Sequence, residues 1–254
     1  MQIIQAPSPN FNDRRFPLDM LVLHYTGMGT SESALKRMCD EDAQVSAHYM
    51  VDEYGRIFQL VAEDKRAWHA GVSVWQGDED LNSRSIGIEI ANGGHNVPTP
   101  DGGLPPYPPQ QIEAVITLCQ AILERHDIPQ TRVVGHSDIA PDRKDDPGEH
   151  FPWQLLSDAG VGLWPDAVDP ASVEGEGLSP GATGPMVSRL QQSLTIIGYG
   201  IDDTGTYDDR TEAVVRAFQR RWNQRHVTGE ADLLTMALID RVALLAANLA
   251  IAFE

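Results

Sequence analysis

Short hydrophobic runs recur through the first half of the chain. They occupy residues 20–25, 46–52, 56–61, 85–91 and 132–135, with polar or Gly-containing segments between them. Runs of this length, rich in Val, Ile, Leu and Met, are typical of strands buried in a sheet. The second and third runs are separated only by Glu53-Tyr54-Gly55, which predicts a hairpin.

Other segments follow a helical period. Residues 110–126 carry apolar side chains three or four positions apart, namely Ile112, Val115, Ile116, Cys119, Ile122 and Leu123, and Pro108-Pro109 precede them. A shorter helix is predicted at 33–40. Strands alternating with helices predict an α/β fold, a mixed sheet covered by helices, with a functional site at the strand ends.

The composition changes beyond residue 163. Residues 164–180 are rich in Pro, Gly, Ser, Asp and Glu and predict a linker. Helical spacing returns between Met186 and Ile197, after Thr211, and from 232 to 250. We therefore expect a first domain over 1–163 and a small three-helix domain over 181–254. The apolar stretch 244–253 could cover the first domain or a second subunit.

Charge and cysteine content narrow the function classes. The 254 residues carry a formal net charge of −18, which argues against nucleic acid as a partner because phosphate binding needs a basic face. The acidity is explained by solubility. Cys39 and Cys119 both fall in predicted helices, so we expect free thiols.

No run approaches the length of a membrane span, and residues 1–20 show neither the apolar core of a signal peptide nor a lipidation Cys. We expect a cytoplasmic protein, with periplasm or outer membrane as the alternative. The sequence leaves the oligomeric state open.

Two histidines and an aspartate form a candidate metal site. His24 ends the run 20–25, His136 follows the run 132–135, and Asp146 lies in the Pro-rich loop that comes next. Two imidazoles and a carboxylate, with a fourth position for water, are a recurrent ligand set for hydrolytic zinc. Taken singly, His24 suits a structural role and Asp146 suits a turn.

A further carboxylate strengthens the hydrolytic interpretation. Glu89 lies in the apolar run 85–91, where burying it is costly unless it is paired or used. A buried Glu beside an activated water is the usual arrangement for a general base. His48 and His69 are alternative metal ligands.

Five motifs give the chain a family resemblance. LVLHYT, VSAHYMVDEYGRIFQLV, RAWHAGVS, SIGIEIAN and VVGHSDIAPDRKDDPG lie between residues 16 and 155. In this order they resemble the zinc-dependent N-acetylmuramoyl-L-alanine amidases of the amidase type 2 family, which includes the peptidoglycan recognition proteins. The tail, with GPMVSRLQQSLTIIGYGI and TGTYDDRTEAVVRAFQRRW, resembles a helical peptidoglycan-binding domain.

The resemblance implies a role for each matching residue. One zinc ion per chain would be held by His24, His136 and Asp146. Glu89 would be the catalytic acid and base, and Lys144 would stabilise the oxyanion. Asp142 departs from the Gly that relatives often carry in this loop, but it replaces no catalytic group.

The implied substrate is peptidoglycan or a muropeptide, cut between N-acetylmuramic acid, or its 1,6-anhydro form, and L-alanine in peptidoglycan turnover or recycling. Substrate contacts are predicted for Arg66, His69 and Arg84, although either arginine suits a solvated surface equally well. Two rival functions are a non-catalytic peptidoglycan sensor and a zinc endopeptidase that cuts stem peptides.

Overall fold

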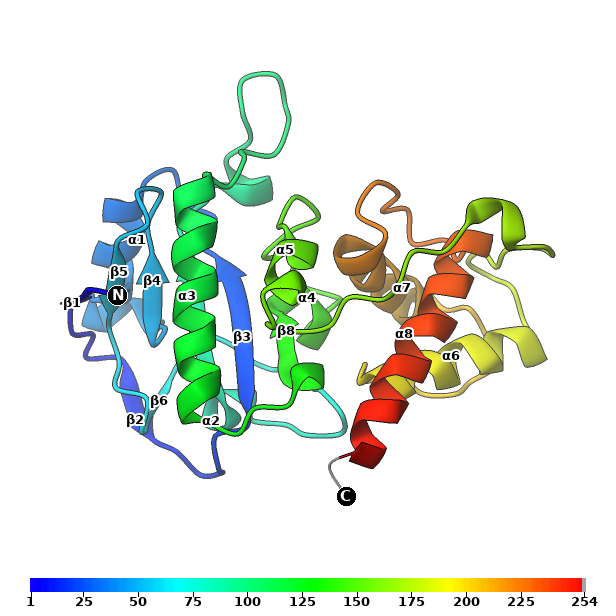
Figure 1. The fold of residues 1–254 in the computed structure, drawn as a ribbon, viewed down its shortest axis with the longest axis horizontal. Coiled ribbons are helices and arrows are strands. Elements are labelled where there is room, and N and C mark those ends of the chain that lie inside the picture. Colours follow the sequence, from blue (N-terminus) through cyan, green and yellow to red (C-terminus); the bar gives the residue numbers. More distant parts are fainter. Residues whose placement is uncertain (253–254) are drawn as a thin grey trace.

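A six-stranded mixed sheet forms the centre of the first domain (Figure 1). The structure is a computed structural model that describes residues 1–252, with side chains described as far as residue 249. The strand order is β1-β5-β4-β7-β3-β8. The strands are β1 (Ile3–Gln5), β3 (Met20–Tyr25), β4 (Tyr49–Val51), β5 (Ile57–Gln59), β7 (Ser85–Ile90) and β8 (Val133–Gly135).

The hydrophobic runs of the sequence supply the central strands. β3 pairs in parallel with β7 on one side and with β8 on the other, and β7 also pairs in parallel with β4. β4 and β5 are antiparallel, as the hairpin prediction requires. The predicted α/β class with a mixed sheet is confirmed. The antiparallel pair of β2 (Phe11–Asp13) and β6 (Lys65–Ala67) was not predicted, because neither strand is hydrophobic.

The two faces of β3 meet different surroundings because successive side chains of a strand alternate. Leu21 and Leu23 pack in one hydrophobic cluster with the buried face of α3 (Pro109–Arg125), which lies in front of the sheet and runs alongside β3 and β4 in Figure 1. Met20 and Val22 face the other way and belong to a second cluster. His24 shares their parity, so its side chain lies on the face of the sheet opposite α3.

Shorter helices complete the first domain. They are α1 (Ser31–Met38), α2 (Leu81–Arg84), α4 (His136–Ile139) and α5 (Trp153–Asp158). The helix predicted at 33–40 begins two residues earlier, where the Thr30 side chain accepts a hydrogen bond from the Ser33 amide as an N-cap. Both cysteines are free thiols, and Cys119 is fully buried in α3.

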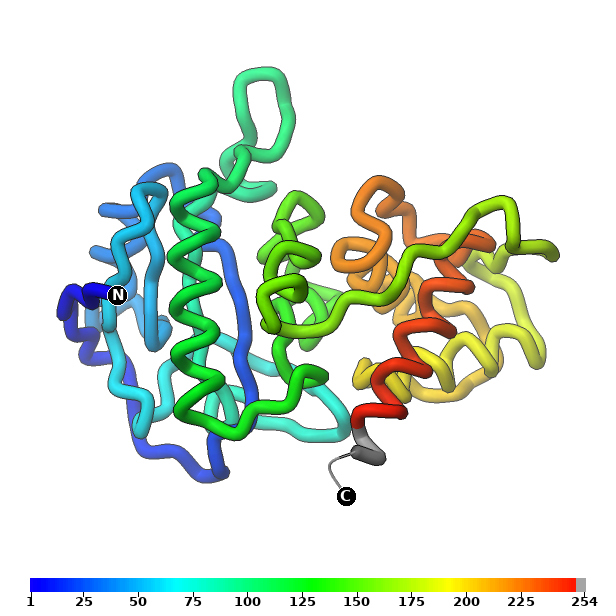
Figure 2. Tube along the Cα trace, viewed as in Figure 1, coloured from blue at the N-terminus to red at the C-terminus, as the bar shows by residue number. Residues whose placement is uncertain are grey.

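The three helices predicted in the tail are α6 (Pro185–Ile197), α7 (Asp209–Trp222) and α8 (Leu233–Ala252). They lie beside the β8 edge of the sheet (Figure 2). One hydrophobic cluster contains Met20, Trp75 and Val134 of the first domain together with Val187 and Phe218 of the tail. The two parts therefore share a core.

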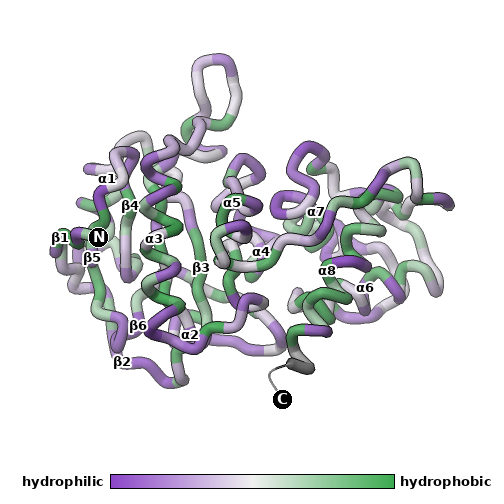
Figure 3. The backbone as a smooth tube through the Cα atoms, in the orientation of Figure 1, coloured by the Kyte–Doolittle hydropathy of each residue, from purple (hydrophilic) through white to green (hydrophobic). Residues whose placement is uncertain are grey.

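Hydrophobic residues recur along β3 and most of α8 (Figure 3). In α8, Ile239 and Val242 are buried whereas Leu244 is 63% exposed. The prediction that residues 244–253 cover the first domain or a second subunit depends partly on residue 253 and on the side chains from residue 250 onward. These lie outside the described residues. Among the described helices, none is long and apolar enough to cross a membrane.

Candidate active site and metal centre

His24, His136 and Asp146 converge at one edge of the sheet. His24 lies near the end of β3, and His136 follows β8 directly as the first residue of α4. Because β3 and β8 are parallel neighbours, their carboxyl ends meet at the same edge. The His24 and His136 Nδ1 atoms are 2.9 Å apart, and they lie 2.9 and 3.0 Å from Asp146 Oδ2. All three side chains are buried.

The contacts of His136 define its tautomer. Its Nε2 lies 3.1 Å from the Ala70 carbonyl oxygen, which can only accept a hydrogen bond. Nε2 therefore carries the proton, and Nδ1 presents a lone pair to the Asp146 carboxylate. Two acceptors at 3.0 Å repel each other unless a proton or a cation lies between them.

His24 is oriented by a chain of hydrogen bonds on its other side. The Ser85 hydroxyl donates to the Leu81 carbonyl at 2.6 Å, so Ser85 Oγ accepts from His69 Nε2 at 3.2 Å. His69 Nδ1 is then an acceptor, and His24 Nε2 donates to it at 3.0 Å. His24 Nδ1 thus also presents a lone pair towards Asp146.

These orientations fit a metal ion. The three donor atoms lie within 4.8 Å of one another, and two neutral imidazoles with a carboxylate suit zinc. Hydrogen bonds from the outer ring nitrogens of both histidines are the usual support for metal ligands.

The electrostatics favour the protonation states that a metal requires. Burial and the neighbouring His136 lower the pKa of His24 to about 4, so its ring is neutral at neutral pH. Burial alone would raise the pKa of the Asp146 carboxyl, but a proton shared with His136 and His24 holds it below its ordinary value, so the carboxyl is ionised at neutral pH. A neutral His24 ring and an ionised Asp146 are the forms that bind a cation.

Glu89 lies beside the candidate metal centre. It pairs with His24 in the register of β7 and β3, so both side chains are on the face opposite α3. Its Oε2 is buried and has no hydrogen-bond partner among the described residues. Burial and the charge of Asp146 raise the pKa of Glu89 well above its ordinary value, and Lys144 opposes this rise. A carboxyl with a raised pKa, aimed at a metal centre, is suited to accept and return a proton.

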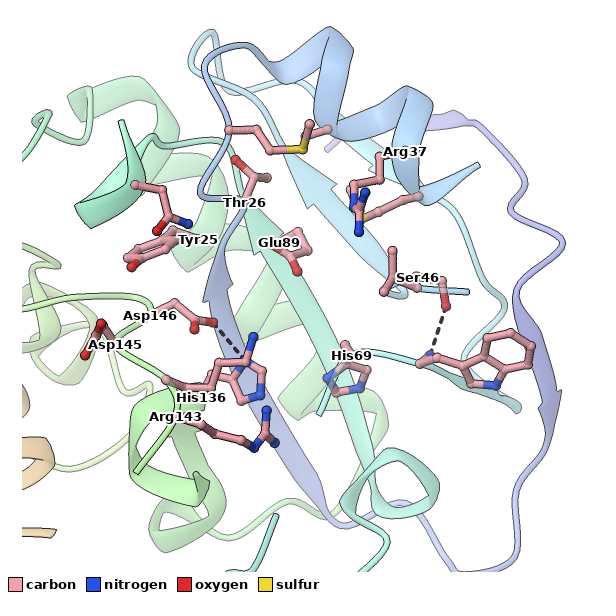
Figure 4. A pocket seen from close by; sticks show the side chains of 17 residues that line it. Tyr25, Thr26, Arg37, Ser46, His69, Glu89, His136, Arg143, Asp145 and Asp146 are labelled. Atoms are coloured by element: carbon pink, nitrogen blue, oxygen red, sulfur yellow. Dashed lines mark hydrogen bonds and ion pairs between the residues drawn. The ribbon is translucent and has the colours of Figure 1, made fainter. Parts of the chain in front are cut away.

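A pocket of about 320 Å³ gives access to these groups. In Figure 4, Glu89, His136 and Asp146 face the pocket from one side and Arg37 of α1 reaches in from another. Lys144 also lines the pocket, close to Asp146 in the chain. The pocket thus brings together a candidate metal site, a carboxyl with a raised pKa and a lysine in one concave surface.

Comparisons with known proteins agree with this geometry. Residues 14–149 match the family described as N-acetylmuramoyl-L-alanine amidase, and residues 183–239 match a putative peptidoglycan binding domain. AmiD, an N-acetylmuramoyl-L-alanine amidase of Escherichia coli, is 39% identical over 230 residues, which cover 88% of this chain and 81% of AmiD. The chain belongs to the N-acetylmuramoyl-L-alanine amidase family.

Relatives of known structure extend the similarity to both parts of this amidase. The Escherichia coli AmiD complex with anhydro-N-acetylmuramic acid-L-Ala-D-γ-Glu-L-Lys has a TM-score of 0.76 and 36% identity, covering 90% of this chain and 89% of AmiD. AmpDh3 from Pseudomonas aeruginosa, in complex with anhydromuramic pentapeptide, has a TM-score of 0.75 and 34% identity, covering 88% of this chain and 90% of AmpDh3. AmpD of Haemophilus influenzae, a 1,6-anhydro-N-acetylmuramyl-L-alanine amidase, is 34% identical over 59% of this chain and 88% of its own length.

The structure separates the predicted substrate contacts Arg66 and Arg84 from His69. Arg66 pairs with Asp80, and Arg84 pairs with Asp19 and Asp78; neither arginine is among the residues that line the pocket. His69 lines the pocket and also contacts His24. His48 is fully buried beside His69, and its Nδ1 accepts a hydrogen bond from the Gly87 amide.

Sequence reasoning missed several residues of the amidase pocket, including Arg37, Trp68 and Asn96. Arg37 lies on the polar side of a short amphipathic helix. At such a position, a residue that lines a pocket and a residue that faces only solvent have the same sequence pattern. Asp142, which departs from the family pattern, forms an ion pair of 2.8 Å with Arg210 of α7. The Asp142 side chain therefore connects the loop that leads to Asp146 with the tail.

Proposed function

We propose that this amidase is zinc-dependent and that His24, His136 and Asp146 hold the ion. The observation that carries the proposal is the convergence of two imidazole lone pairs on one buried carboxylate, with an unpaired Glu89 beside them. When bound, zinc supplies Lewis-acid chemistry, lowering the pKa of water and polarising a carbonyl group.

Glu89 moves the proton in the proposed reaction. Its carboxylate accepts a proton from the water that attacks the lactyl carbonyl of the muramoyl group. The resulting carboxylic acid returns that proton to the leaving nitrogen of L-alanine, and the amide bond breaks. Its surroundings support both roles, because burial favours the protonated form while Lys144 favours the ionised one.

Lys144 stabilises the oxyanion that develops on the lactyl oxygen. Lys144 lines the pocket and lies two residues before the proposed ligand Asp146 in the chain. A cation placed where negative charge develops lowers the barrier most effectively in a site shielded from water.

The substrate that the pocket fits is a muropeptide whose stem peptide carries free carboxylates. Arg37 lines the pocket and supplies a guanidinium group that pairs with carboxylates, whereas the Arg143 guanidinium donates to the Ala70 and Val72 carbonyls. Trp68 adds an aromatic surface for an apolar group. Complexes of the similar proteins AmiD and AmpDh3 with anhydromuramic peptides support the anhydro form as one substrate. Contacts from Arg66 and Arg84 stay predictions, and their ion pairs argue against them.

Product analysis tests the reaction against its rivals. Purified sacculi and anhydro-muropeptides are digested side by side, zinc is quantified, and the products are identified by mass spectrometry. An amidase releases muramic sugars together with intact stem peptides. An endopeptidase instead gives cut peptides, and a sensor gives no turnover; either result would exclude the proposal.

The cellular compartment also stays a prediction. Action in the cytoplasm would direct the enzyme to recycled muropeptides, whereas action in the periplasm or at the outer membrane would direct it to the wall itself. Fractionation of cells that express the natural gene distinguishes these compartments.

A further inference from the structure

A buried carboxylate beside His136 receives two hydrogen bonds from the C-terminal part of the chain. Asp138 lies in α4, two residues after His136, and its side chain is 1% exposed. Its Oδ2 accepts from the Gly135 amide at 2.8 Å and from Arg221 Nη1 at 3.0 Å. Its Oδ1 accepts from the Tyr199 hydroxyl at 2.8 Å.

Arg221 of α7 also contacts the strand that leads to His136. Its Nη2 donates to the Val133 carbonyl at 3.0 Å, and its side chain is 3% exposed. Its guanidinium carbon lies 4.2 Å from the ring centre of Trp153 and 4.5 Å from that of Trp222. One cation is thus fixed between two aromatic rings and spans both the start of β8 and the turn after it.

The same turn connects His136 with Asp146. The Ser137 amide donates to the Asp146 carbonyl at 2.9 Å. The preceding residue of α7, Arg220, forms an ion pair with Asp145, which adjoins Asp146 in the chain. Two consecutive arginines of one helix therefore reach both ends of the segment that carries two of the three proposed ligands.

We propose that Arg221 and Tyr199 are positioning residues of the metal centre, acting on His136 through Asp138. The inference rests on the proposed metal site. It gives the helical tail a role beyond retaining the enzyme on its substrate, since α7 holds the turn from which His136 projects. Metal affinity depends on the placement of ligands within a few tenths of an ångström, so loosening this turn weakens binding.

The test separates positioning from simple docking of the tail. Arg221→Met alone leaves a buried, unpaired Asp138 and risks unfolding, so it is combined with Asp138→Asn. Arg189→Met is the control, because Arg189 forms an exposed ion pair with Asp240 within the tail itself. Tyr199→Phe removes only the hydroxyl donor and keeps the aromatic ring.

Zinc dissociation constants are measured by chelator competition well below the unfolding temperature, and kcat and KM are measured on a soluble anhydro-muropeptide. For the double variant we expect the zinc dissociation constant to rise about 10-fold or more. At subsaturating zinc, kcat should fall with little change in KM. Tyr199→Phe should show a smaller shift in the same direction, and Arg189→Met should match wild type.

Wild-type zinc affinity and kcat in a folded double variant would overturn the inference. If the double variant does not fold, Tyr199→Phe decides: a weakened zinc affinity supports positioning, and an unchanged one overturns it. Failure of wild type to bind zinc or to hydrolyse the muropeptide would instead refute the proposed function.

Discussion

Glu89 and His24 occupy paired positions on the neighbouring parallel strands β7 and β3, with both side chains on the face of the sheet opposite α3. This register places the proposed acid/base beside a proposed metal ligand through backbone hydrogen bonds alone. Because a one-residue slip would send either side chain to the α3 face, sheet pairing itself fixes the geometry of the site.

Removing any of the three ligands should abolish metal binding. We expect His24→Ala, His136→Ala and Asp146→Ala each to lose stoichiometric zinc and turnover, because two remaining ligands bind zinc too weakly. Chelation of wild type should remove activity reversibly. Metal analysis of purified protein checks this, with the exposed His226→Ala as the control that keeps zinc. Retention of zinc by the ligand variants together with its loss in His48→Ala would contradict the assignment.

Glu89→Gln should separate metal binding from catalysis. The amide keeps the shape of the side chain but cannot exchange a proton, so we expect full zinc content and a rate lower by roughly two to four orders of magnitude. Single-turnover kinetics on a soluble muropeptide measure the loss. A variant that stays within a factor of a few of the wild-type rate would exclude Glu89 as the acid/base.

The raised pKa of Glu89 predicts how the stability of metal-free protein depends on pH. The folded state favours the protonated carboxyl, so ionisation destabilises it as the pH rises above the ordinary value of 4.5. Glu89→Gln should therefore unfold with the same free energy as wild type near pH 4 and become the more stable protein at higher pH. Each unit of pKa elevation corresponds to about 1.4 kcal/mol. Urea titrations at several pH values give this difference, and parallel stability curves would contradict the prediction.

Sequence patterns predicted the central fold and the main chemistry because both depend on local signals. The run Met20–Tyr25 forms a strand with the predicted bounds, and α3 differs from its predicted range by one residue at each end. His24 and Glu89 stood out because they interrupt hydrophobic runs. His69 was predicted only as a substrate contact or an alternative ligand, and Ser85 was not singled out, because the hydrogen bond between them depends on packing. Arg221 and Asp138 are 83 residues apart, and neither periodicity nor spacing indicates that they meet.

His69 offers a test of metal-ligand orientation against substrate contact. His69→Phe keeps a ring of similar shape but removes the acceptor for His24 Nε2, so His24 can adopt the wrong tautomer. We expect zinc affinity to fall about 10- to 100-fold. Ser85→Ala should give a smaller loss of zinc affinity, because it removes only the acceptor that keeps the proton on His69 Nε2. A raised KM with unchanged zinc affinity would show that His69 serves the substrate instead.

The close approach of His69 to the sheet requires Gly87. A Cβ at this position would lie 2.5 Å from atoms of the His69 ring. Gly87→Ala should therefore displace the ring and weaken zinc binding, although the residue is not a ligand. Gly77→Ala is a control with no atom near its added Cβ, although its positive φ adds local strain. Comparison of zinc affinities and thermal unfolding checks the effect, and a wild-type zinc affinity for Gly87→Ala would contradict it.

Truncation after residue 180 tests whether the tail is an independent binding module. From the linker alone, we expect the truncated enzyme to cut small muropeptides almost normally and to act weakly on insoluble peptidoglycan. The shared core changes this expectation, because Trp75 is 1% exposed and packs edge-to-face against Tyr199, 5.1 Å between ring centres. Without the tail, Trp75 and the Asp138 carboxylate both become exposed. We now expect a lower unfolding temperature and comparable losses on both substrates, and a truncated enzyme that keeps full muropeptide activity would restore the tether interpretation.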